Sequence, residues 1–267
     1  MNNVFDIKRF GKYFLYDLRR AKNNYLISLL LMGLMPVAFF IIYQFFSLIS
    51  GHGVSEMPGE MTCMAIVVSI FVVVLGAGAK IYGSITEKRA GSDYLMLPAS
   101  TLEKWLSMIL IVCVVLPVAL FVLLFVSDGI MGLLFPNTYG TRIFEMDFAN
   151  GFLNGFADTE GFYFNLPGIM FLNWCESLLI FTLGAVCFKK AKVAKTLLCL
   201  MAFSMVMTPL MLLIFGTSNI DTDWLLERFG DADSIITTFN WTLNIIYTVV
   251  IGGLLAGLYV RLRTLKH

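Results

Sequence analysis

The chain contains 267 residues, of which 58% are apolar and 14% are charged, and its mean hydropathy is +0.82. Soluble domains have about 45–50% apolar and ~25% charged residues, so this composition is typical of a membrane protein. A net charge of +1 argues against nucleic acid as a partner, and five cysteines without a C-x-x-C pair argue against a disulfide scaffold.

The first 20 residues have an apolar side and a basic side at helical spacing. The apolar side comprises Ile7, Phe10, Phe14 and Leu18, and the basic side comprises Lys8, Arg9, Lys12, Arg19 and Arg20. This pattern predicts an interfacial helix in the headgroup layer, with its basic side toward anionic lipid. The helix is either a topology anchor or an elbow that couples the first span to a cytoplasmic partner.

Six apolar runs are long enough to cross a bilayer, because a hydrocarbon core of ~30 Å requires about 20 helical residues. We expect transmembrane helices near residues 25–49, 61–84, 105–134, 166–188, 196–217 and 235–260. The first run exceeds the 7–15 apolar residues of a secretory signal, so we expect the N-terminal segment to be retained. The predicted fold is an all-α polytopic membrane protein with one domain over residues 1–267.

The lysines and arginines are distributed unevenly between the connections. All but two of the 19 lie before the first run, after the second, after the fourth or after the sixth. The exceptions are Arg142 and Arg228, in connections that are otherwise rich in acidic residues. The positive-inside rule therefore places both termini in the cytoplasm, as an even number of spans also requires, and we expect an integral plasma (inner) membrane protein.

The connection between the second and third runs combines polar ends with an apolar centre. Tyr94, Leu95, Met96 and Leu97 are consecutive there. Four exposed apolar side chains in a cytoplasmic loop predict a docking surface for another protein. Pro98 then breaks the segment, and Ser100 with Glu103 predicts a capping box at the start of the next helix. A rigid hairpin without a partner is the alternative.

The same loop resembles that of the permease subunits of ABC-2-type exporters, which have a KR-x-GS-x-x-x-LLP-x-S-x-x-E/K pattern after their second span. Here the segment 88–104 is KRAGSDYLMLPASTLEK. The resemblance implies a cytoplasmic coupling helix that is moved by a separate ATP-hydrolysing subunit, and a second permease copy or paralogue as a further partner. The residues that it assigns to ATPase coupling are Lys88, Arg89, Gly91, Asp93, Tyr94, Leu97, Pro98, Ser100 and Glu103.

The sequence lacks the G-x-x-x-x-G-K-[ST] motif of phosphate-binding loops. We therefore expect ATP and Mg on the partner subunit and no cofactor on this chain. The two histidines, His52 and His267, are too far apart in sequence for a metal site, and the predicted spans contain none. An enzymatic function, such as that of an intramembrane hydrolase, is accordingly not expected.

The fourth predicted span contains Glu176, with Asn173 one turn before it on the same face. A carboxylate at the centre of a bilayer costs about 2.5–3.5 kcal/mol, so Glu176 must face protein or a water-filled cavity. It is either a packing residue or the centre of an ion- or proton-coupled carrier. A membrane scaffold or sensor subunit without transport activity is the remaining alternative.

Two outer connections carry weaker signals. Residues 135–165 are rich in glycine, asparagine and aromatic residues and predict a packed loop, which has no counterpart in the ABC-2 pattern. Residues 222–229 predict a short helix. Pro36, Pro117 and Pro209 each interrupt a predicted span and allow a kink there.

Overall fold

The computed structural model describes residues 5–87, 91, 92, 94, 96–140, 166–215 and 232–264, and the secondary structure in these ranges is entirely helical. Five helices are long and apolar enough to cross a membrane, namely Ile7–Ile49, Gly59–Ile81, Thr101–Leu134, Lys192–Leu210 and Asn240–Thr264; Phe171–Cys187 is a shorter apolar helix. Of the predicted outer loop 135–165, residues 141–165 lie outside the described residues, as does the short helix predicted over 222–229.

The N-terminal helix differs from the sequence expectation. Helix α1 (Ile7–Gly33) begins at the N-cap Asp6 and continues through residues 20–25 without a break. The chain turns only at Leu34, before α2 (Met35–Ile49). Pro36 stands in the first turn of α2, where its missing N–H leaves no hydrogen bond unmade. The amphipathic segment is therefore the first half of a long helix, and the structure shows no elbow where the apolar run begins.

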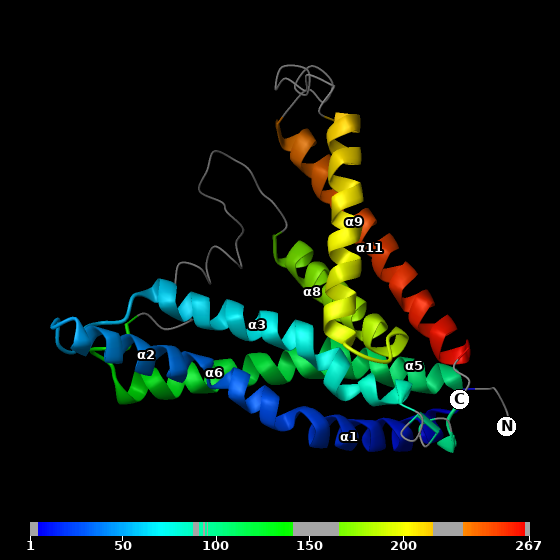
Figure 1. Cartoon of the computed structure of the whole chain (residues 1–267), viewed down its shortest axis with the longest axis horizontal. Coiled ribbons are helices and arrows are strands. Elements are labelled where there is room, and N and C mark those ends of the chain that lie inside the picture. Colours follow the sequence, from blue (N-terminus) through cyan, green and yellow to red (C-terminus); the bar gives the residue numbers. More distant parts are fainter. Residues whose placement is uncertain are drawn as a thin grey trace.

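Helix α3 (Gly59–Ile81) lies antiparallel beside α1 and is followed by the short 3-10 helix η1 (Gly83–Thr86). Ser69 Oγ donates to the carbonyl of Met32 at 3.0 Å, and Lys80 Nζ donates to Ser28 Oγ at 2.6 Å. These contacts set the C-terminal end of α3 beside the middle of α1. The N-terminal half of α1 consequently extends beyond the end of α3 (Figure 1).

The third apolar run forms one continuous helical rod with an irregular turn. It consists of α5 (Thr101–Leu110), the π-helical turn η2 (Ile111–Val115) and α6 (Leu116–Leu134). Pro117 cannot donate to the carbonyl of Cys113 and its ring crowds that carbonyl, so a regular α-helical turn is disfavoured there. The π turn accommodates this mismatch, and π turns are frequent at functional sites.

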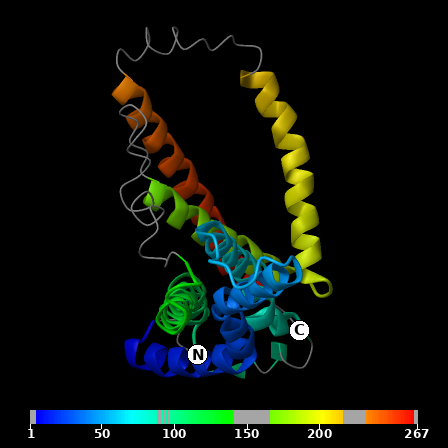
Figure 2. The same cartoon turned by 90° about the vertical axis from the view of Figure 1, so that its left-hand side faces the viewer.

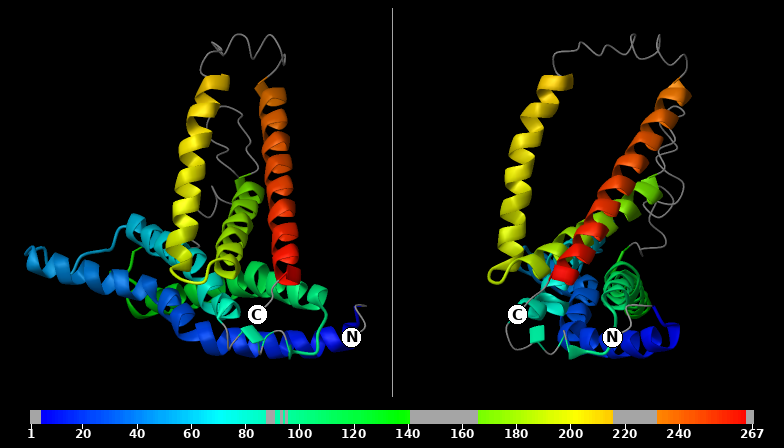
Figure 3. Two further views of the ribbon diagram at one scale, coloured as in Figure 1. Left: turned by 45° about the vertical axis from the view of Figure 1, so that its right-hand side comes forward. Right: turned by 90° about the vertical axis from the view of Figure 1, so that its right-hand side faces the viewer.

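The remaining helices are α8 (Leu166–Cys187), α9 (Lys192–Phe215) and α11 (Ala232–Thr264). Helix α8 packs closely on α3, because a Cβ atom on Gly78 would lie only 2.8 Å from the backbone of Thr182. Helices α9 and α11 extend away from the group formed by α1, α3 and α6 (Figure 1), and they stand apart from each other along most of their length (Figure 2 and the right view of Figure 3). In each of them only 6% of the apolar window is buried.

The main hydrophobic core lies where α1, α3, α5, η2 and α6 meet α8 and the C-terminal end of α11. The N- and C-terminal ends of the chain lie at the same end of the molecule (Figure 2). The largest buried aromatic side chains of the main core are Tyr82 and Tyr94. A smaller cluster at the opposite end joins Phe40, Met57, Met131 and Tyr139. Tyr139 there donates from its hydroxyl to Asp128 Oδ1 at 2.8 Å. The main core therefore adjoins the 86–104 loop, since Tyr94 belongs to it.

Candidate functional site

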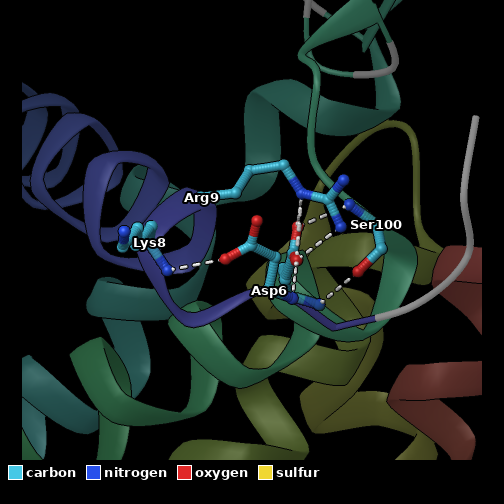
Figure 4. A network of polar contacts seen from close by, with 5 residues as sticks. Asp6, Lys8, Arg9 and Ser100 are labelled. Atoms are coloured by element: carbon cyan, nitrogen blue, oxygen red, sulfur yellow. Dashed lines mark hydrogen bonds and ion pairs between the residues drawn. The ribbon is translucent and has the colours of Figure 1, made fainter.

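Glu103 joins the beginnings of two helices (Figure 4). Its side chain has no exposed surface, and its carboxylate accepts hydrogen bonds from Arg9 NH2 at 2.7 Å and from Arg9 Nε at 2.9 and 3.0 Å. The backbone N–H groups of Asp6 and Ser100 also donate to it, at 3.0 and 2.8 Å. Because Asp6 caps α1 and Ser100 caps α5, one carboxylate fixes both helix N-termini to each other.

These donors determine the charge of Glu103, which lies before the apolar run that begins at Trp105. Burial alone raises the pKa of the Glu103 carboxyl, but the hydrogen bonds from Arg9, Asp6 and Ser100 outweigh it and lower that pKa to about 2. The positive ends of two helix dipoles act in the same direction. The Arg9–Glu103 pair is therefore ionised at neutral pH.

A second buried carboxylate, Asp17, connects three segments about two turns further along α1. It accepts hydrogen bonds from the Tyr82 hydroxyl at 3.0 Å and from Ser107 Oγ at 2.7 Å. Burial raises the pKa of Asp17, while these two hydrogen bonds and the charge of Arg20 oppose that rise. Asp17 precedes the apolar run of α1, and it links α1, the end of α3 and α5.

Tyr94 in the middle of the 86–104 loop is buried, with 2% of its surface exposed. Its ring lies between two cations, 5.7 Å from the Arg20 guanidinium carbon and 5.1 Å from Lys104 Nζ. Lys104 Nζ also donates to the carbonyl of Tyr94 at 2.8 Å, and Arg20 NH2 donates to Ser84 Oγ at 2.8 Å. The expectation that Tyr94 is exposed is therefore wrong, because α1 and α5 supply cations that hold its ring inside the chain.

The other apolar residues of the loop divide between its two sides. Leu97 is half-buried against the main core, whereas Met96 is 81% exposed and Pro98 is exposed. The predicted run of four exposed apolar side chains is thus wrong for Tyr94 and Leu97 and correct for Met96; Leu95 lies outside the described residues. The exposed apolar tip that remains, Met96 and Pro98 with the 41% exposed Leu102 of α5, is named the loop tip below.

The residues that the ABC-2 resemblance assigns to coupling fall into three groups. Ser100 and Glu103 form the predicted capping box, which the structure confirms. Gly91 is buried, so it presents no surface to a partner. Lys88, Arg89 and Asp93 lie outside the described residues. The sequence did not single out Asp17 or Tyr82; Asp17 could have been noticed as the acidic residue within the otherwise basic segment 8–22.

We call the region where Glu103, Asp17 and Tyr94 hold α1, α5 and the 86–104 loop together the junction. The embedded polar residues lie on α8, away from the junction. Asn173 Nδ2 donates to the hydroxyl of Tyr247 on α11 at 3.2 Å, and Glu176 is half-buried. On the other side of α8, an open apolar cavity of about 210 Å³ lies between it and the η2–α6 segment, and the thiols of Cys113 and Cys175 contact each other at its edge. Among the described residues, no cluster of three histidine, cysteine, aspartate or glutamate side chains could hold a metal ion.

Comparison of the chain with protein-family models, curated proteins and solved structures finds no match. The functional interpretation therefore depends on the residues themselves. The carboxylates of Glu103 and Asp17 and the ring of Tyr94 are all engaged by contacts within the chain. These contacts form a rigid connection between the exposed loop tip and helices α1 and α5.

Proposed function

We propose that the chain is the membrane-spanning permease subunit of an ATP-driven exporter of the ABC-2 type. In this proposal six helices cross the plasma (inner) membrane, with α8 as the fourth, and both termini lie in the cytoplasm. A separate ATP-hydrolysing subunit binds ATP and Mg and engages the 86–104 loop. A second permease copy or paralogue completes the transporter.

The observation that carries the proposal is the contrast between the two sides of this loop. On its outer side Met96, Pro98 and Leu102 present apolar surface to the surroundings. On its inner side Tyr94 is fixed to Arg20 and Lys104, and Glu103 is fixed to Arg9. A displacement of the loop tip must therefore move α1 and α5 as well, since buried and paired groups cannot separate cheaply.

A displacement of α5 acts first on the π turn η2, which follows α5 directly. Helix α5 leads directly into η2 and α6, and α8 lies across the cavity beside η2. Single π turns inside α-helices occur frequently at functional sites. Movement of α5 would thus alter the contact between α6 and α8 within the membrane, as alternating access requires.

Co-purification tests the proposal. The tagged chain is isolated in mild detergent from membranes of its own cells, and recovered proteins are identified by mass spectrometry and assayed for ATP hydrolysis. We expect an ATP-hydrolysing subunit with the unchanged chain and at least a tenfold lower recovery with Met96→Asp, because a carboxylate at the loop tip cannot be desolvated in an apolar contact.

The matched control is Val54→Asp, which places the same charge on an exposed apolar position at the far end of the molecule. Recovery with this variant should equal that of the unchanged chain. Substitutions of Tyr94 or Leu97 do not serve here, because both contact the core and would perturb folding. Absence of any ATP-hydrolysing protein from the unchanged preparation would contradict the proposal.

A carrier centred on Glu176 is the second candidate, and the polar contact between Asn173 and Tyr247 one turn away favours it. Intramembrane carboxylates commonly mark ion or substrate pathways. This alternative predicts that Glu176→Gln abolishes transport in proteoliposomes without ATP while the protein remains folded. An ATP-dependent flux that survives Glu176→Gln would exclude it.

A further inference from the structure

The N-terminal half of α1 presents a row of positive charge away from the protein. Lys8, Lys12, Arg19 and Lys22 are all exposed and share one face of the helix, with the exposed Leu15 between them. The opposite face carries Tyr13, Asp17, Ala21 and Tyr25, which are all buried. We call the four exposed cations the cationic stripe.

Contacts within the described part of the chain do not neutralise this stripe. The ion pair there, between Arg9 and Glu103, uses a cation outside the stripe. Asp6 accepts a hydrogen bond from the backbone N–H of Lys8 as the helix cap, a contact that does not involve the Lys8 side chain (Figure 4). Like charges at i,i+4 and i,i+3, as in Lys8/Lys12 and Arg19/Lys22, destabilise a helix. An external anionic surface would relieve that repulsion.

The position of the stripe favours a protein surface over lipid headgroups. Lys80, the charged residue in the last turn of α3, binds Ser28 of α1 and marks the cytoplasmic edge of the span in the proposed topology. Lys8 precedes Ser28 by 20 residues of unbroken helix, which is about 30 Å at 1.5 Å per residue. The headgroup layer on each side is only about 5–8 Å thick, and screening limits electrostatic attraction to about 10 Å. With α1 running along the membrane normal in that topology, Lys8 and Lys12 lie beyond the reach of lipid, whereas Arg19 and Lys22 remain close enough to contact headgroups.

We propose that the cationic stripe docks an acidic surface of a cytoplasmic protein. This inference rests on the proposed topology, and within the proposed function that protein is the ATP-hydrolysing subunit. The Arg9–Glu103 pair holds the start of the stripe beside the start of α5, so the loop tip and the stripe lie at the same end of the molecule. The partner then contacts apolar side chains at the loop tip and cations along α1.

Site-specific photo-crosslinking tests this docking. Leu15 lies inside the stripe and carries no charge, so Leu15→p-benzoylphenylalanine leaves all four cations in place. After illumination of intact cells, the adduct is purified and the crosslinked segment is sequenced by mass spectrometry. We expect a protein adduct in a segment with an excess of aspartate and glutamate, and at least a tenfold lower yield in the Lys12→Glu/Arg19→Glu background.

The control background is Lys189→Glu/Lys190→Glu, which reverses two exposed charges on another cytoplasmic turn and should leave the yield unchanged. A lipid adduct, no adduct, or a protein adduct outside an acidic segment would overturn the inference. Equal loss in both backgrounds would also overturn it, since the effect would then be nonspecific. A crosslink to an acidic segment of a protein that hydrolyses no ATP would support docking of the stripe and contradict the proposed function. Failure of the inference and failure of the proposed function are therefore distinguishable.

Discussion

The junction around Tyr94 and the helices α9 and α11 differ in which side chains they bury and which they expose. At the junction, Glu103 and Asp17 are buried and bound by several donors. In α9 and α11 most apolar residues of the membrane window face outward. The first region holds its shape through contacts within the chain, whereas the second depends on its surroundings. Substitutions should therefore have large effects at the junction and small ones on α9.

The largest effect is expected for Tyr94→Ala. It removes a buried aromatic ring and leaves Arg20 and Lys104 without their shared contact, so the free energy of unfolding should fall by about 4 kcal/mol. Chemical denaturation in detergent measures this change. The neighbouring Met96→Ala, at an exposed position, should change it by less than about 0.5 kcal/mol. Similar losses for both variants would show that the loop does not have two distinct sides.

Glu103→Ala should lower the free energy of unfolding by about 3 kcal/mol, because Arg9 and two backbone N–H groups lose their acceptor. Glu87→Ala, at an exposed position near the start of the loop, is the matched control and should be nearly neutral. If the two glutamate variants were equally stable, the connection between the starts of α1 and α5 would not contribute to stability.

The same pair predicts a pH dependence. The pKa of Glu103 is about 2 in the folded chain against an ordinary value of 4.5, so its contribution to stability is complete above pH 4.5. As the pH falls from 4.5 through 2, protonation of the carboxyl removes that contribution. The stability difference between the unchanged chain and Glu103→Ala should therefore shrink over this interval and stay constant from pH 5 to 8. A difference that grows on acidification would contradict the ionised pair.

Ser107→Ala should have an intermediate effect, a loss of about 2 kcal/mol, because it removes one of the two hydrogen bonds to the buried Asp17 carboxylate. Thermal unfolding in detergent measures the change. Ser204→Ala on α9, where the serine hydroxyl bonds only to a carbonyl of its own helix, is the comparison variant and should be neutral. A neutral result for Ser107→Ala would remove Asp17 from the set of structural links.

The smallest effect is expected on α9, where Leu198→Ala should change the free energy of unfolding by less than about 0.5 kcal/mol in detergent. Leu198 is exposed, so its side chain exchanges one apolar environment for another. Leu179→Ala on α8, at a buried position, should cost at least 2 kcal/mol in the same assay. A large loss for Leu198→Ala would mean that α9 packs against protein.

The sequence predicted features that depend on neighbouring residues. The apolar runs predicted the helices, and Ser100 with Glu103 predicted the capping box, because a capping box is complete within four residues. Pro36 and Pro117 correctly marked the break before α2 and the irregular turn in the third span. The sequence did not show that α1 is unbroken, because a helix whose polarity changes along its length carries no local stop signal.

Features that depend on distant residues could not be predicted. Tyr94 stands in the apolar centre of a loop with polar ends. The neighbouring sequence does not reveal that Arg20, 74 positions earlier, covers its ring. The contact between Cys113 and Cys175 was likewise hidden, since their spacing has no motif. Glu103 was predicted as a helix cap, but its pairing with Arg9 joins residues 94 positions apart. The capping box was therefore predicted from the sequence, while the buried contacts of Tyr94 and Glu103 required the fold.

One measurement tests most directly whether the 86–104 loop is a cytoplasmic docking site. Met96→Cys is placed in a chain whose five native cysteines are replaced by alanine, and a membrane-impermeant maleimide is applied to intact cells and to inverted membrane vesicles. Met96→Cys should be labelled in inverted vesicles alone, and less when the ATP-hydrolysing subunit is bound. Labelling of Met96→Cys from outside intact cells would contradict a cytoplasmic docking site.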